Sequence, residues 1–119
     1  MMPFKIHCID VQNSLQNYIW LLEHTVSHQV AVIDPTEADL VHAYCAEHDL
    51  IISQIWLTHW HKDHIGGVPG LIQGKNLPVY GPRAELSKIP FITHPLEHEE
   101  QFNFHGIDIQ VIAVPGHTL

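Results

Sequence analysis

The residues whose types and spacing suit chemistry lie together in one short stretch, Thr58-His-Trp-His-Lys-Asp-His-Ile-Gly-Gly67. It places three histidines and one carboxylate within six positions. Neutral imidazole and carboxylate are the ligands that zinc and similar metals take in proteins, and imidazole loses its proton near neutral pH. The stretch therefore predicts a metal site.

The spacing of these ligands predicts how they divide. His59 and His61 are two residues apart, so in an extended segment their side chains point the same way and reach one ion. Asp63 and His64 are adjacent and point elsewhere, which indicates a second, neighbouring ion. Gly66 and Gly67 let the following helix begin close to the metals.

The plainer interpretation is a polar loop in a histidine-rich chain, since the chain has 12 histidines. For a lone histidine a surface or hydrogen-bonded role is the better prediction, but the whole pattern after an apolar strand and before Gly-Gly favours metal binding. The ordinary role is expected for the other histidines outside the site, at positions 7, 24, 28, 42, 48, 94, 98 and 105.

The elements around this stretch follow from the hydrophobic pattern. Short apolar runs predict strands at 18–22, 30–33 and 55–57, whereas the stretch from Phe4 to Val11 alternates only loosely. A helix is expected over 37–48, and a shorter one over 68–73. Thr36, with Asp39 three residues later, resembles a capping box at the start of the first helix.

The second half of the chain predicts shorter pieces. A strand is expected at 79–80, a turn at Gly81-Pro82, and irregular chain over 90–101 with a solvated acidic cluster. Hairpin strands are expected at 102–104 and 107–114. Strands mixed with helices in one unit indicate an α/β or α+β fold.

Composition limits the partners and the compartment. The 119 residues suffice for one domain, and a formal net charge of −8 argues against nucleic acid and anionic membrane surfaces. The longest apolar run has five residues, against the ~20 of a spanning helix. The first residues lack the apolar core of a secretion signal, so a cytoplasmic protein is expected. Cys8 and Cys45 are expected to be reduced packing residues.

Several motifs together resemble a known family. The stretch at 58–67, with Ile33-Asp-Pro35 and Pro115-Gly-His-Thr118, is similar to the metallo-β-lactamase fold superfamily. The resemblance is strongest to glyoxalase II, the hydroxyacylglutathione hydrolases, through Asn17-Tyr-Ile-Trp20, Val79-Tyr-Gly-Pro82 and the residues from Val114 to Leu119. It implies an αββα sandwich, of which residues 1–119 would form the N-terminal half, a domain incomplete at its C-terminus.

The resemblance also implies residue roles. His59, His61 and His117 would bind the first metal, while Asp63 and His64 would bind the second; Asp63 is also the catalytic candidate. Asp34 would support these ligands from outside the metal shell. The implied cofactor is zinc, one or two ions per chain, although the ligand types also suit iron or manganese.

The implied reaction is metal-assisted attack of water on the thioester of S-D-lactoylglutathione, giving D-lactate and glutathione. The sequence departs from the family at Trp60, Lys62 and Thr36, none of them at a ligand position. The family's bridging aspartate, its last histidine ligand and its glutathione-binding region follow the position of His117. The second site, with two ligands here, should therefore bind weakly.

Three functions fit these observations. The first is the thioester hydrolase. The second is another enzyme on the same fold, such as a β-lactamase or an iron persulfide dioxygenase. The third is a catalytically inactive metal-binding fragment, for which self-association through the incomplete sheet is expected.

Overall fold

The computed structural model describes residues 3–11, 18–58, 67–73, 75–83, 86–87, 89–97 and 99–110. Within them the elements follow in this order: β1 (Phe4–Asp10), β2 (Tyr18–His24), β3 (Gln29–Ile33), α1 (Ala38–His48), β4 (Ile51–Trp56), α3 (Val68–Ile72), β5 (Val79–Pro82), β6 (His94–Leu96), β7 (Gln101–Phe104) and β8 (Ile107–Gln110). No helix among the described residues is long and apolar enough to span a membrane.

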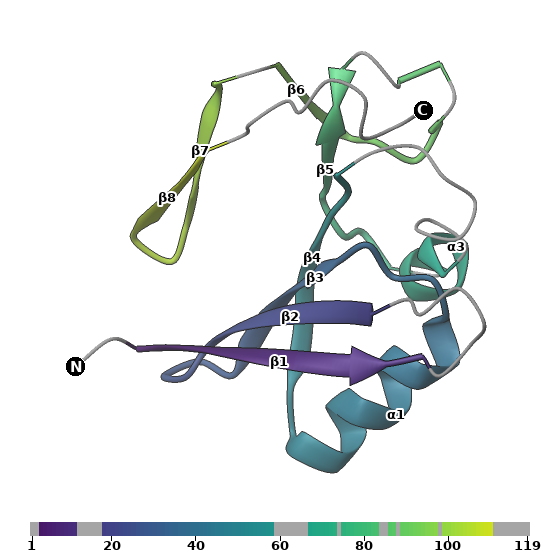
Figure 1. Ribbon diagram of the computed structural model, residues 1–119, viewed down its shortest axis with the longest axis vertical. Helices are drawn as coiled ribbons and strands as arrows, with labels where there is room; N and C mark the ends of the chain where they lie inside the picture. The colour runs from purple at the N-terminus through teal and green to yellow at the C-terminus, as the bar shows by residue number, and fades with distance from the viewer. Residues whose placement is uncertain are drawn as a thin grey trace.

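A mixed sheet forms the centre of the molecule. Its order is β1-β2-β3-β4-β5-β6, with β7 and β8 in a separate two-stranded sheet. The first three strands pair antiparallel, and β3, β4, β5 and β6 pair parallel. Parallel neighbours need a crossover, and α1 and α3 lie in the two crossovers on either side of β4 (Figure 1). The carboxyl ends of β3, β4 and β5 therefore meet at one edge.

The main core lies between the sheet and the two helices. Strand alternation decides which side chains enter it: Ile19 and Leu21 of β2 are buried, while Tyr18 and Trp20, which alternate with them, face the other way and are exposed. The helices contribute buried side chains from one side each. The members with the least exposure include Val30, Val32, Val41, Ile55, Val68 and Leu71. This packing fixes the helices on one face.

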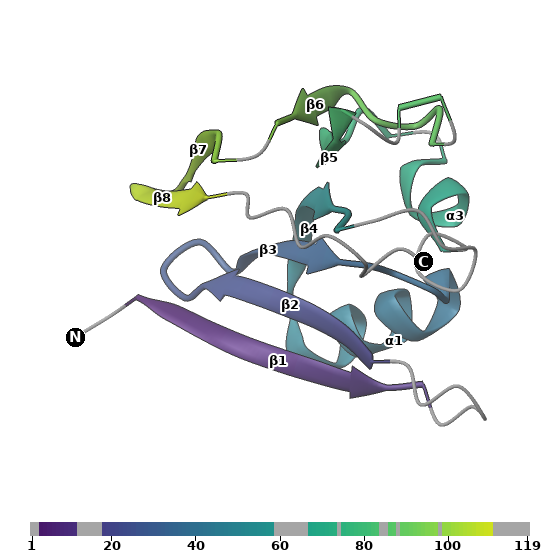
Figure 2. The same ribbon diagram turned by 45° about the horizontal axis from the view of Figure 1, so that its top comes forward.

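The opposite face of the sheet carries aromatic side chains that hold the β7–β8 hairpin. Trp56 of β4 meets Phe102 and Phe104 edge to face, with ring centroids 5.3 and 5.4 Å apart. Tyr80 of β5 stacks on Phe102 at 4.3 Å. Aromatic pairs at these separations stabilise packing beyond the area that they bury. Figures 1 and 2 show the hairpin on the side of the sheet away from the helices, as the beginning of a second layer.

Much of this architecture was predicted. The strands at 18–22 and 30–33 lie within β2 and β3, and the helix over 37–48 is α1 with one residue fewer. The strand predicted at 55–57 overlaps the end of a longer β4, which stops at Trp56, and the short helix begins at Val68 as expected. The hairpin turns at His105-Gly106, and of its second strand residues 111–114 lie outside the described part of the chain.

Three local predictions are wrong. Gly81 and Pro82 do not form a turn but end β5, where they pair with Pro95 and Leu96. That partner strand, β6, interrupts the region expected to be irregular. The capping box is absent: Glu37 is the N-cap without a side-chain hydrogen bond, and the buried Thr36 hydroxyl finds no hydrogen-bond partner within the described residues.

The prediction that both cysteines are reduced is confirmed, but the packing role expected of both holds only for Cys45. Both thiols are free, Cys45 buried in α1 and Cys8 exposed on β1. Burial raises the pKa of the Cys45 thiol to about 11, which the Lys75 charge offsets only in part. Cys45 is therefore an inert packing residue, as expected, whereas Cys8 lies on the sheet face away from the helices, opposite Trp20.

Candidate metal centre

The edge where β3 and β4 end positions the start of the histidine-rich stretch. The two strands run parallel, and the Asp34 backbone N–H donates to the Trp56 carbonyl at 3.0 Å. Thr58, two residues further on, donates twice to the Asp34 carboxylate: from its N–H to Oδ1 at 2.9 Å and from its hydroxyl to Oδ2 at 2.6 Å. Hydrogen bonds to an ionised group are shorter and stronger than neutral ones. The residue before His59 is thus held tightly.

Asp34 holds Thr58 while its own backbone adopts a left-handed conformation. It is buried, and its φ of 51° lies in the left-handed region. Aspartate tolerates this region better than most residues, whereas a bulky or β-branched side chain does not. The structure thus places the residue given a supporting role by resemblance directly against the beginning of the candidate metal loop.

The other end of the stretch, at Gly67, is held by Pro35, the residue that follows Asp34. The backbone N–H of the buried Gly67 donates to the Pro35 carbonyl at 2.8 Å. Gly67 is the N-cap of α3, so this bond also sets where the helix begins. Two consecutive residues, Asp34 and Pro35, therefore hold the two ends of the segment 59–66.

All five predicted metal ligands lie outside the described residues: His59, His61, Asp63 and His64 within 59–66, and His117 within 111–119. Their ligand roles stay predictions. In the described part of the chain no three His, Cys, Asp or Glu side chains are placed to hold a metal ion. The segment between Thr58 and Gly67, the residues held by Asp34 and Pro35, contains most of the donors that zinc prefers.

A cavity of about 360 Å³ lies beside Thr58, between the six-stranded sheet and the hairpin. Its walls are mostly apolar and aromatic, with the Thr58 and Gln110 side chains as polar members. The other residues that line it are Ile33, Trp56, Leu57, Tyr80, Gly81, Pro82, Leu96, Phe102 and Ile109. This cavity was not predicted, because its walls come from separate strands that meet only in the folded chain.

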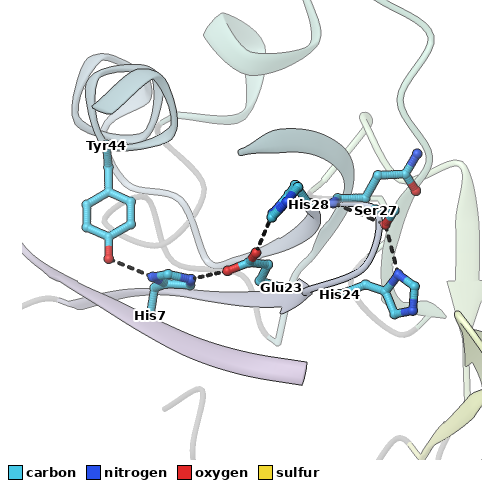
Figure 3. Close-up of polar contacts among 7 residues, drawn as sticks. His7, Glu23, His24, Ser27, His28 and Tyr44 are labelled. Atoms are coloured by element: carbon cyan, nitrogen blue, oxygen red, sulfur yellow. Dashed lines mark hydrogen bonds and ion pairs between the residues drawn. The ribbon is translucent and has the colours of Figure 1, made fainter. Parts of the chain in front are cut away.

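Two of the histidines expected to have ordinary roles belong to a hydrogen-bonded network that is buried at His7 and Glu23 and reaches the surface at His28. His7 of β1 makes hydrogen bonds to Glu23 Oε1 and to the Tyr44 hydroxyl, both at 2.7 Å, and His28 bonds to Glu23 Oε2 at 2.9 Å. Figure 3 shows Glu23 between the two imidazoles, with Tyr44 reaching down from α1. This hydrogen-bonded role confirms the prediction for His7 and His28. The network joins β1, β2 and α1 rather than serving the candidate metal centre.

A mixed sheet covered by helices on one face, with a second sheet beginning on the other, is the metallo-β-lactamase fold. A solved structure with this arrangement is the B3 metallo-β-lactamase BLEG-1, which superimposes with a TM-score of 0.80 at 22% identity over 96% of this chain and 63% of that one. The family model of the metallo-β-lactamase superfamily matches residues 15–119. The chain belongs to that superfamily.

Curated relatives carry a more specific name. The chain is 41% identical to the hydroxyacylglutathione hydrolase of Marinomonas sp. over 87% of its own length and 39% of the relative's. It is 41% identical to the enzyme of that name from Pseudomonas savastanoi pv. phaseolicola over 97% of this chain and 43% of the relative. The chain thus spans about two fifths of the length of these relatives.

Proposed function

We propose that this chain supplies the metal-binding part of a glyoxalase II-type thioester hydrolase. The observation that carries the proposal is the anchoring of segment 59–66 at both ends, by Asp34 on Thr58 and by Pro35 on Gly67. The 41% identity to hydroxyacylglutathione hydrolases supports the specific activity. The proposed substrate is S-D-lactoylglutathione or a related S-2-hydroxyacylglutathione, and the products are the 2-hydroxy acid and glutathione.

The proposed ligands are His59, His61 and His117 for one metal and Asp63 with His64 for a second. Imidazole and carboxylate donors fit zinc, and iron or manganese accept the same set. When bound, such a metal polarises the thioester carbonyl and lowers the pKa of a bound water toward neutrality. Three histidines leave an open position for this chemistry, whereas a two-ligand site binds weakly. Asp63 is the proposed catalytic carboxylate.

The described residues hold the two ends of the segment that carries four of the proposed ligands. Asp34 holds both polar donors of Thr58, so the chain leaves β4 in a fixed direction. The Gly67 N–H donates to the carbonyl of Pro35, next to Asp34, so both ends of the segment are held at neighbouring residues. A thiolate is a good leaving group, so the reaction needs no dedicated general acid from the chain. We propose that the reaction takes place in the cytoplasm.

The experiment combines metal content with turnover. The chain is loaded with zinc, dialysed and assayed for loss of the thioester absorbance of S-D-lactoylglutathione. We expect about one tightly held zinc per chain and slow hydrolysis with weak substrate binding. His59→Ala should lose both, while His42→Ala, an exposed histidine on α1, should keep both.

Other outcomes separate the remaining functions of this fold. Faster hydrolysis of a β-lactam, or oxygen consumption with glutathione persulfide, would replace the thioesterase by another enzyme. Zinc binding without turnover of any of the three substrates would leave a metal-binding protein. Two tightly held zinc ions would show that the second site is stronger than its two proposed ligands allow.

A further inference from the structure

Gly67 makes a contact that no other residue could make at its position. A Cβ atom added to it would lie 2.8 Å from the Pro35 carbonyl oxygen, 2.8 Å from the Ala38 nitrogen and 3.0 Å from the Glu37 carbonyl carbon. Ordinary nonbonded contacts begin at roughly 3.5 Å. All three neighbours are backbone atoms, which cannot rotate away as a side chain can. Gly67 therefore lies directly against the backbone between β3 and α1.

The need for glycine here comes from space and not from backbone conformation. The φ of Gly67 is −86° and its ψ is −9°, values that any residue adopts. What a side chain would change is the distance to Pro35, whose carbonyl accepts the Gly67 N–H at 2.8 Å. Any larger residue would have to push the end of segment 59–66 away from Asp34 and Pro35.

We propose that the Gly67–Pro35 contact is a positioning element for metal binding, and that it exists before any metal is present. With Thr58 tied to Asp34 and Gly67 tied to Pro35, the two ends of the segment that carries the candidate ligands are fixed to adjacent residues. Because both ends are already held, the segment loses less conformational freedom when the proposed ligands gather around an ion than it would with free ends. This inference rests on the proposed metal-binding function.

A purely structural role for Gly67, in packing α3 against α1, is the competing explanation. Gly70 has that role: a Cβ on it would lie 2.7 Å from the Ala38 Cβ. The chain therefore offers a matched pair. Gly70→Ala collides with a side chain that Ala38→Gly removes, whereas Gly67→Ala collides with backbone that Ala38→Gly leaves in place.

The test measures three properties of Gly67→Ala and Gly70→Ala, each alone and combined with Ala38→Gly: thermal stability without metal, zinc affinity by chelator competition, and the visible spectrum after cobalt(II) substitution. We expect both single variants to lose stability. Gly67→Ala should also lose at least about tenfold in zinc affinity, the loss typical of residues that orient metal ligands, and change the cobalt spectrum. Gly70→Ala should keep both metal properties.

Addition of Ala38→Gly should restore the stability of Gly70→Ala and leave the zinc affinity of Gly67→Ala low. The inference is overturned if Gly67→Ala binds zinc as Gly70→Ala does with an unchanged cobalt spectrum. Loss of zinc affinity in both variants in proportion to stability would likewise assign Gly67 to packing alone.

Hydrogen exchange on the unaltered chain covers the case in which Gly67→Ala does not fold. The Gly67 amide should be protected in the absence of zinc, because Pro35 already accepts its proton; exchange at the rate of an unstructured peptide overturns the inference. Failure of the proposed function has a different signature. The parent chain would then bind no zinc, or His59→Ala would bind it equally well.

Discussion

At the scale of single residues, the Thr58 hydroxyl makes a separable contribution to the site. It donates to Asp34 Oδ2 at 2.6 Å, while the Thr58 backbone N–H bonds independently to Oδ1. Thr58→Val keeps the shape and the backbone bond but removes the hydroxyl. Because hydrogen bonds to charged groups contribute about 1.5–3 kcal/mol, we expect a loss of that size in the free energy of unfolding, together with weaker zinc binding.

Urea unfolding and chelator competition measure these two effects. Thr58→Ser retains the hydroxyl and is the matched control, expected to lie close to the parent chain in both measurements. Equal stability of the Val and Ser variants would contradict the importance assigned to the hydroxyl bond. A loss of stability without any change in zinc affinity would separate Asp34 from metal binding.

The residue scale also shows how much of the site a sequence can indicate. The donor types and their spacing from His59 to His64 can be read from the sequence alone, as can the Asp34-Pro35 dipeptide. The Pro35 carbonyl is not visible, because every residue has one and only the fold selects which is used. The same holds for the cavity walls, which meet only after distant strands pair.

At the scale of elements, the pattern fails where a buried position is polar. In β1 the apolar Ile6 and Cys8 are exposed, whereas His7 is buried on the helix-facing side, where its bonds to Glu23 and Tyr44 satisfy it. A histidine in that place hides the strand from a hydrophobic pattern, so β1 was not recognised. In β5, Gly81 lies so close to the Ile92 side chain that a Cβ atom on it would be 2.8 Å away. A glycine in a strand can mark such a close approach, but in the sequence Gly-Pro was interpreted as a turn.

The Glu23 network that joins β1, β2 and α1 predicts a pH dependence of stability. Burial raises the pKa of the Glu23 carboxyl, but hydrogen bonds and charges from His7 and His28 outweigh burial, and the net pKa is lowered from 4.5. The folded state then binds fewer protons than the unfolded state as pH falls through this region. The network's contribution is present above pH 4.5 and is lost progressively below it.

Urea unfolding between about pH 3 and pH 7 tests this dependence. Glu23→Gln should lower stability at neutral pH by about 1–3 kcal/mol, because one side of a buried hydrogen-bonded network is altered, and should flatten the decline at acid pH. Glu47→Gln removes an exposed carboxylate on α1 and should leave the decline as steep as in the parent chain. The same acid slope for all three proteins would argue against the network.

At the scale of the whole molecule, the two faces of the sheet differ in how well they are covered. The helices bury one face, whereas on the other the β7–β8 hairpin lies over β4 and β5 and the β1–β2 end carries exposed apolar side chains. Ile6 is 68% exposed, Tyr18 46% and Trp20 44%. Strand register places Ile6 and Trp20 on this same face. An exposed apolar patch beside an edge strand favours association between copies.

The net charge of −8 opposes that association, and salt screens charge repulsion but does not weaken apolar burial. We therefore predict that the chain self-associates through this face, increasingly at higher concentration and higher ionic strength, as measured by sedimentation velocity. Ile6→Lys should reduce the association. Val26→Lys adds the same charge at a position 77% exposed in the β2–β3 turn. Because it leaves the apolar face intact and lowers the net negative charge, it should not reduce association. If Val26→Lys weakens association as much as Ile6→Lys does, the sheet face does not control it; if both variants strengthen association, charge repulsion outweighs the apolar contact.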